Sequence, residues 1–172
     1  KSRLKDLQII VSGTIINNDK VLFLLDLVKQ NLMTNSVTNK LWKPTEKTMI
    51  TPQVAGIQAD YLAHNKDVIL YTMKKNPSVT PAPNIQEGIY TYDAATNTST
   101  YISPEGKDDR FLELLEDRAI LQKNNGEIWQ VSLKDFTKRQ ETQAGTLFLT
   151  TIKGQFMAYD TINIQGDNTY IL

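Results

Sequence analysis

The stretch 117–133, DRAILQKNNGEIWQVSL, decides the fold class of this chain. Two β-prone runs, 119–122 and 128–133, flank the turn residues Asn124-Asn125-Gly126. An Asn-Gly pair between two such runs is the strongest short-range signal for a β-hairpin, because both residues accept the left-handed backbone of a tight turn. The stretch therefore predicts two antiparallel strands.

The same pattern recurs on both sides of this hairpin. Strand-like runs separated by polar turns are expected at 59–62 with 68–73, 89–92 with 98–102, and 147–152, 155–164 and 169–172. Nearer the N-terminus, 7–27 predicts two strands around Asn17-Asn18-Asp19, and 21–28 fits a strand or a short helix. A long polar loop with at most one short strand is expected over 34–52, and an exposed proline-rich loop over 76–88.

One segment, 107–118, is a candidate helix. Phe111, Leu114 and Leu115 form an apolar stripe at helical spacing, with acidic residues opposite. The alternative is a strand that ends at Leu115.

A weak internal repeat joins these segments. KDVIL at 66–70 leads to GIYTYD at 88–93, and DRAIL at 117–121 leads to GEIWQVS at 126–132. We expect a single β-rich domain over 1–172, with repeat units at about 7–58, 59–104, 111–143 and 146–172.

This order of turns and strands resembles the blade repeats of β-propeller-type bacterial extracytoplasmic proteins, in which each blade is a four-stranded meander. The resemblance covers 59–172 and is one of architecture, without a Gly-His…Trp-Asp signature. It implies a mostly β fold, an antiparallel meander of hairpins arranged as propeller-like blades. An open sheet stack fits the same hairpins equally well.

Composition argues against several classes of function. Lys plus Arg and Asp plus Glu both number 19, and no basic stripe occurs, so a nucleic-acid partner is not expected. The absence of cysteine excludes a disulfide scaffold, thiol catalysis and cysteine-based zinc sites. No phosphate-binding loop, nucleophile elbow or bilayer-length apolar run is present. We therefore predict no cofactor, no metal and no transmembrane segment in this chain.

Tyr90, Tyr92 and Trp129 are the candidate ligand-binding residues. Tyr90 and Tyr92 share one face of a strand because side chains alternate with period two, and Trp129 takes the place of Tyr90 in the other repeat. Aromatic side chains so placed can line a groove for a glycan or a protein. Packing between sheets is the competing and favoured interpretation.

Two further features bear on catalysis. His64, the only histidine, lies in a predicted turn and is expected to be solvated. An acidic set could supply paired carboxylates to a glycosidase-like hydrolase, although interleaved basic residues favour a salt-bridged surface. The set comprises Glu105, Asp108, Asp109, Glu113, Glu116 and Asp117.

Together these patterns favour a non-catalytic binding or scaffolding domain that engages a protein or a glycan. The alternatives are a carboxylate-dependent hydrolase and a structural module of a larger assembly. A cysteine-free, Thr- and Asn-rich composition and a first residue that is not Met favour an extracytoplasmic or cell-surface location.

Overall fold

The computed structural model describes residues 7–14, 19–34, 37–52, 54–66, 68–142, 146–152 and 155–160. This part of the chain consists of strands in antiparallel hairpins and contains no helix, which confirms the predicted mostly β meander. Accordingly, no helix in these ranges is long and apolar enough to cross a membrane. Contacts divide the chain into two compact units, Lys1–Tyr61 with Lys75–Asn84, and Leu62–Lys74 with Ile85–Leu172.

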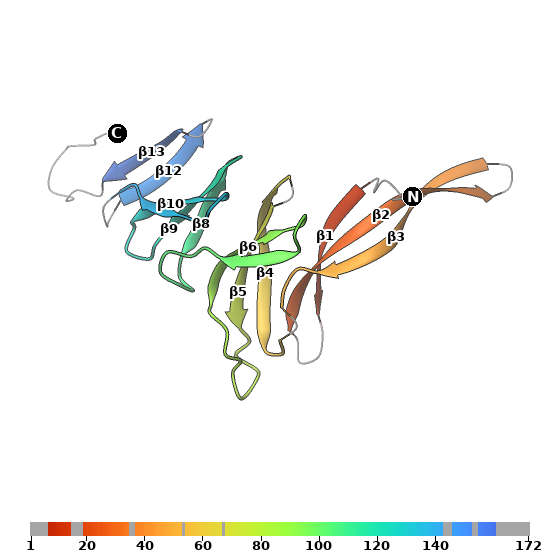
Figure 1. Cartoon of the computed structure of the whole chain (residues 1–172), viewed down its shortest axis with the longest axis horizontal. Coiled ribbons are helices and arrows are strands. Elements are labelled where there is room, and N and C mark those ends of the chain that lie inside the picture. Colours follow the sequence, from red (N-terminus) through yellow and green to blue (C-terminus); the bar gives the residue numbers. More distant parts are fainter. Residues whose placement is uncertain are drawn as a thin grey trace. The chain divides into compact units, whose positions relative to one another are not determined.

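The first unit is built around one long strand. Its strands are β1 (Leu7–Thr14), β2 (Lys20–Thr34), β3 (Val37–Met49) and the first part of β4 (Ile57–Asn65). Both β1 and β3 pair antiparallel with β2, and a single parallel bridge joins Lys20 of β2 to Gln58 of β4. Figure 1 shows the extended β2–β3 hairpin in orange.

The strand β3 corrects the expectation of a long loop over 34–52. Twelve of its thirteen residues pair with β2, from Phe23↔Met49 to Thr34↔Val37, and a register shift beside Pro44 leaves Thr45 without a partner. Polar composition did not prevent strand formation, because a β-ladder is held by backbone hydrogen bonds that every residue except proline can supply, and the single proline lies next to the irregularity. Over 21–28, the expected strand is confirmed and the helical alternative is wrong.

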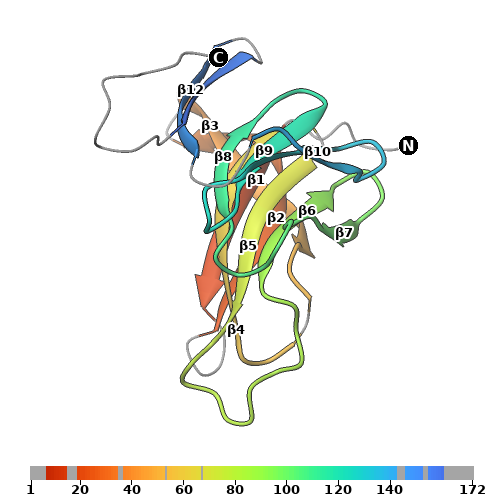
Figure 2. The same cartoon turned by 90° about the vertical axis from the view of Figure 1, so that its left-hand side faces the viewer.

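A buried carboxylate ties three segments of the first unit together. Asp19 is 2% exposed, and its Oδ2 accepts the backbone N–H of Gly56 at 2.7 Å. Its Oδ1 accepts the side-chain amide of Asn76 at 2.8 Å, and the Asn76 backbone N–H donates to Gly56 O at 2.8 Å. Asn76 thereby anchors the start of the proline-containing loop, which Figure 2 shows in yellow-green.

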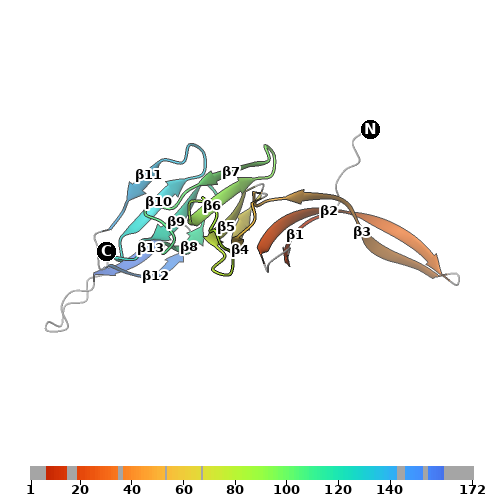
Figure 3. The same cartoon turned by 90° about the horizontal axis from the view of Figure 1, so that it is seen from below.

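The second unit contains two four-stranded antiparallel meanders among its described residues. The first, β4-β5-β6-β7, includes only the second part of β4 and belongs to a seven-stranded sheet in which β4 is also bridged to β2. The second, β8-β9-β10-β11, is a sheet of its own, and sequential strands are neighbours in both meanders. Figure 3 shows them as adjacent layers. The strands are β5 (Val68–Lys75), β6 (Gly88–Asp93), β7 (Thr98–Tyr101), β8 (Arg110–Leu114), β9 (Arg118–Gln122), β10 (Ile128–Ser132) and β11 (Lys138–Gln140), followed by the hairpin β12 (Thr146–Ile152) and β13 (Gln155–Asp160).

One apolar cluster joins the two meanders. The first contributes fully buried residues of β5, β6 and the segment after β7, and the second contributes residues of β9 and β10. They are Leu70, Ile89, Ile102, Ala119, Leu121 and Val131. Each is 0% exposed, so the cluster is the core of the second unit.

The strand β8 shows that the helix expected over 107–118 is wrong, and a β-bulge explains the error. Pairing with β9 shifts between Phe111 and Glu113, which leaves Leu112 without a directly opposite residue. Phe111 and Leu114 consequently face the main cluster, whereas Leu112 and Leu115 pack against a second one, Ile120 with Ile128. A bulge thus produces the three-residue apolar spacing that resembles a helix.

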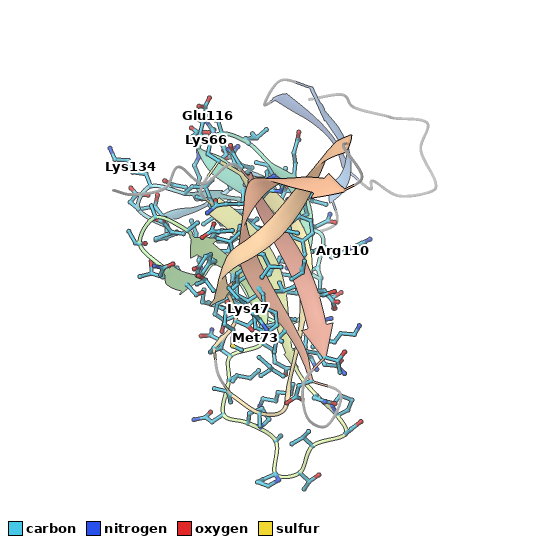
Figure 4. All side chains as sticks on the ribbon, turned by 90° about the vertical axis from the view of Figure 1, so that its right-hand side faces the viewer. Lys47, Lys66, Met73, Arg110, Glu116 and Lys134 are labelled. Carbon is cyan, nitrogen blue, oxygen red and sulfur yellow. The ribbon has the colours of Figure 1, made fainter. Side chains whose placement is uncertain are left out.

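Contacts define two ends of the second unit. At the turn end, the Asn65 side chain donates to Leu115 O, the Leu133 N–H donates to Asp117 O, and Lys66 pairs with Glu116. Figure 4 shows Lys66, Glu116 and Lys134 at this end. At the loop end, the connections 102–109 and 123–127 meet through Lys123 and Glu105, 3.9 Å apart.

The remaining expectations stand as follows. The predicted hairpins at 59–73, 89–102 and 119–133 are confirmed as strand pairs, as is that of 147–152 with the described part of 155–164, up to residue 160. Residues 17–18 of the predicted turn, 161–164 and the strand at 169–172 lie outside the described residues. The single domain over 1–172 and the four repeat boundaries stay predictions.

Replacing Asp19 tests its role as an anchor. In Asp19→Ala, the buried donors of Gly56 and Asn76 lose their acceptor, so the free energy of unfolding should fall by about 3 kcal/mol in urea titrations. Asp60→Ala is the matched control, because Asp60 meets Lys20 at 3.7 Å with both side chains more than half exposed, and its effect should stay within about 0.5 kcal/mol. Equal effects in the two variants would contradict the anchoring role.

Candidate functional site

Tyr90 lies in a row of three tyrosines that crosses the first meander. The β-register sets Tyr71, Tyr90 and Tyr101 opposite one another on β5, β6 and β7. The Tyr90 ring stacks on Tyr71 with centroids 5.5 Å apart and meets Tyr101 edge-on at 5.3 Å. The Tyr90 hydroxyl donates to Gln86 O at 2.6 Å. Half-buried and engaged on two sides, Tyr90 is held mainly by packing.

Tyr92 follows on the same strand but is only 2% exposed. Its hydroxyl donates to Asn97 Oδ1 at 2.7 Å and so braces the β6–β7 turn, where Asn97 adopts a φ of 55°. An external ligand has almost no access to this ring. The structural position of Tyr92 is that of a core residue with a hydrogen-bonded hydroxyl.

Trp129 lies on β10 and faces a group of charges at the loop end. Its indole N–H donates to Glu127 Oε2 at 3.1 Å, and Lys123 Nζ lies 5.4 Å from its ring centroid. The rings that contact Tyr90 are those of Tyr71 and Tyr101. The two aromatic positions that correspond in the repeats therefore have different neighbours.

Lys123 and Glu127 form the charged centre of the loop end. Their ion pair spans 2.9 Å, and both side chains are less than one-fifth exposed. The hydrogen bond to Glu127 raises the pKa of Lys123, with further contributions from Glu105 and Asp109. The pKa of Glu127 is lowered first by the hydrogen bond from Lys123, then by those from Trp129 and Asn125. Both groups are thus held in their charged forms.

Asp109 is the buried carboxylate of this end, 8% exposed. Its Oδ2 accepts the backbone N–H groups of Glu105 and Gly106 at 2.9 and 3.0 Å, which closes the loop. Its Oδ1 is buried and accepts no hydrogen bond from the residues that the structure describes. An oxygen in this state retains full capacity to accept a donor.

Lys138 connects β11 of the second meander to the end of β7. Its Nζ donates to Ser103 O at 2.6 Å and lies 5.2 Å from the Tyr101 ring centroid. Burial lowers the pKa of Lys138, and the charge of Asp109 partly offsets this. Ser103 is also tied to β6, because its hydroxyl accepts the Ile89 N–H at 2.7 Å.

The approach of Ser103 to β6 requires a glycine. Gly88 has a φ of 149°, and a Cβ at this position would lie 2.6 Å from Ser103 Oγ. No side chain fits in that space without displacing the segment that follows β7.

We call Glu105, Asp109, Lys123, Glu127 and Trp129 the loop-end cluster. Lys138, Tyr101 and Ser103 hold its loop in place.

The acidic set from the sequence divides between the two ends. Glu105, Asp108 and Asp109 belong to the loop end, whereas Glu116 and Asp117 lie at the turn end, paired with Lys66 and Arg118. Glu113 lies on β8 between the two ends, and its Oε2 is buried without a hydrogen bond from the described residues. The five residues of β8 separate the two ends by about 17 Å. Within the described ranges, no three His, Asp or Glu residues gather as a metal site requires. His64 is exposed on β4 and not in the predicted turn.

Sequence reasoning missed Lys123 and Glu127 beside Trp129, and it named Asp109 in the acidic set without its neighbours. Lys123 and Glu127 flank the Asn-Gly turn, and the Lys123 N–H donates to Glu127 O across it. A hairpin prediction already implies that residues flanking the turn face each other, so this pair had a usable signal. Asp109 and Lys138 come together only through packing of the two meanders, which leaves no local pattern.

Titration of Tyr71 tests its burial within the tyrosine row. Burial raises its pKa from 10.0 to about 12, and Tyr90 adds to this while the hydrogen bond to Ser99 opposes it. Above pH 10 the unfolded chain loses this proton first, so the free energy of unfolding should fall by about 2 kcal/mol as pH rises to 12.

Urea titrations across this pH interval measure the decline. Tyr71→Phe should remove most of it, and the raised pKa of Tyr90 should account for a smaller remainder. Tyr61→Phe, a change at a tyrosine that is 43% exposed, is the control and should leave the decline intact. An undiminished decline in Tyr71→Phe would contradict the assignment.

Comparison with protein-family models, with curated proteins and with solved structures finds no match to this chain. What the loop-end cluster can bind is therefore inferred from its own residues. The cluster contains the half-buried indole of Trp129 and the ion pair of Lys123 with Glu127. It also contains the exposed carboxylate of Glu105 and the buried Oδ1 of Asp109, which accepts no hydrogen bond from the described residues.

Proposed function

We propose that this chain is a non-catalytic scaffolding domain that binds a protein partner through the loop end of its second unit. The observation that carries the proposal is the loop-end cluster, in which Trp129 contacts one ion pair, with Lys123 over its ring and Glu127 at its indole N–H. Tryptophan within such a polar surround is typical of protein-binding surfaces, where a few aromatic residues supply most of the binding energy.

The architecture supports a scaffold of propeller-like blades. Two four-stranded meanders follow each other in the chain, and their apolar faces share one cluster. Sequential strand order within a meander and face-to-face contact between meanders are features of propeller blades. In such scaffolds, rigid sheets position connecting loops for recognition, and 102–109 and 123–127 are loops of this kind.

A protein partner fits the cluster better than a glycan. Sugars commonly stack on an open aromatic face, but Lys123 already lies over the Trp129 ring, and Glu127 already accepts the indole N–H. The exposed groups around this core are charged, since Glu105, Lys107 and Asp108 all face solvent. Charged rims of mixed sign guide the association of proteins and set its specificity.

Two alternative functions draw less support. A hydrolase would need two carboxylates about 5–10 Å apart across a cleft, whereas the acidic set is spread along β8, with Glu113 on the strand and the other members beyond its two ends. A purely structural module agrees with the packed meanders but assigns no role to the loop-end cluster. An extracytoplasmic or cell-surface location stays a proposal that rests on the Thr- and Asn-rich composition.

The binding proposal is tested by affinity capture on the immobilised chain, followed by calorimetry with any protein retained. Trp129→Ala and Glu105→Lys should each weaken binding about tenfold or more, because they remove the aromatic anchor and reverse a rim charge. Lys134→Glu is the control, a charge reversal at the exposed turn end, and should leave affinity unchanged.

A parallel glycan array separates the two partner classes. Saturable glycan binding that is lost in Trp129→Ala would replace the protein partner by a sugar. Capture that is insensitive to both loop-end variants would place the interface elsewhere. If neither proteins nor glycans bind, the structural module becomes the better explanation.

A further inference from the structure

The turn between β9 and β10 carries the only Asn-Gly pair of the sequence, Asn125-Gly126. Asn125 is exposed, and Gly126 adopts a φ of 93°. The backbone nitrogen that follows an asparagine can attack the side-chain amide carbon, and glycine hinders this attack least because it has no Cβ. Asn125 therefore combines access to solvent with the most permissive following residue, and it lies beside Glu127 of the loop-end cluster.

Deamidation through a cyclic imide is the reaction that this pair permits. The Gly126 nitrogen bonds to Asn125 Cγ, the bond from Cγ to Nδ2 breaks, and the proton of the Gly126 nitrogen leaves with the amide as ammonia. Water then opens the imide, and aspartate or isoaspartate remains at position 125. The overall change consumes water and turns a neutral amide into a carboxylate.

Three hydrogen bonds of the folded turn oppose this reaction. The Gly126 N–H donates to Lys123 O at 2.9 Å, so the attacking nitrogen retains its proton in a hydrogen bond. The Asn125 side chain accepts the Glu127 N–H through Oδ1 at 3.1 Å and donates from Nδ2 to Glu127 Oε1 at 2.9 Å. The amide can leave only after these contacts open, and each hydrogen bond adds to the free energy of that opening.

The carboxylate of Glu127 is itself fixed in place. Its Oε2 accepts Lys123 Nζ at 2.9 Å and the Trp129 indole N–H at 3.1 Å, while Oε1 accepts the Asn125 amide. The Glu127 side chain is only 17% exposed. One carboxylate thus connects the indole and the ammonium of the loop-end cluster to the amide that can react.

We propose that Asn125 is a deamidation site restrained by Glu127, and that its conversion irreversibly changes the loop-end cluster. Deamidation replaces the donor that lies 2.9 Å from Glu127 Oε1 by a second negative charge. Like charges at such short range repel, so Glu127 turns away and its contacts with Trp129 and Lys123 loosen. The chemical step needs no partner, and only its effect on partner binding rests on the function proposed above.

Mass spectrometry tests the site and its restraint on the full chain, incubated in mildly alkaline buffer. The folded wild type should deamidate at Asn125 at least about tenfold more slowly than the chain unfolded in guanidinium, because the hydrogen bonds of the turn must open first. Glu127→Ala removes the acceptor of Nδ2 and should accelerate the reaction about threefold or more. Its rate should remain below that of the unfolded chain, which separates local release from global unfolding.

Two variants control for stability and charge. Asp19→Ala is expected to destabilise the first unit without touching this turn, and Glu116→Ala removes an exposed carboxylate at the turn end. Both should deamidate at the wild-type rate. Equal rates in the folded and unfolded wild type, or a wild-type rate in Glu127→Ala, would overturn the restraint. An unfolded chain that keeps Asn125 intact would overturn the site.

Nuclear magnetic resonance of the Asn125→Asp chain tests the effect on the cluster. The indole N–H cross-peak of Trp129, assigned with Trp129→Phe, should shift because Glu127 no longer holds its hydrogen bond. Asn124→Asp introduces the same charge one residue earlier, at an exposed asparagine, and should leave the cross-peak in place. An unmoved cross-peak in Asn125→Asp would overturn the change of the cluster. Neither assay contains a partner, so a failure of partner binding would leave both results unaffected.

Discussion

Burial of one apolar face between two meanders is the constraint on which the second unit depends. A single hairpin is marginally stable in water, and even a four-stranded sheet needs a hydrophobic face covered. The covering is mutual here, with Leu70 and Ile89 on one side and Leu121 and Val131 on the other. Ile102 belongs to the same cluster, so the connection 102–109 begins inside the core. The connection 102–109 is consequently fixed by packing of Ile102 in the core as well as by the hydrogen bonds that Asp109 accepts within the loop.

Local patterns in the sequence were sufficient to predict most strands. Alternation and turn chemistry located the hairpins around Asn97 and Gly126, since both residues adopt a positive φ that these turns require. Two strands were not predicted from local patterns, for different reasons. The strand β3 has a polar sequence and exists because β2 offers a long backbone partner. The strand β8 has a helix-like spacing because of its bulge.

The candidate site was only partly accessible from the sequence. Period-two alternation placed Tyr90 and Tyr92 on one strand face, but it could not distinguish the half-buried ring from the ring that is 2% exposed. Trp129 was identified as an aromatic position without its charged surround. Asp109 and Lys138 are 29 positions apart along the printed sequence, and only the packed meanders bring their charges into range. Long-range electrostatics of this kind has no signature in a single sequence.

The bulge in β8 also affects how the repeats can be compared. The extra residue at Leu112 puts every position before it one step out of phase with the partner strand β9. A residue count that runs through β8 without a gap therefore assigns inward- and outward-facing positions wrongly on one side of Leu112. Equivalent positions in this chain are therefore better defined by the residue that each one faces on the neighbouring strand than by their distance along the sequence.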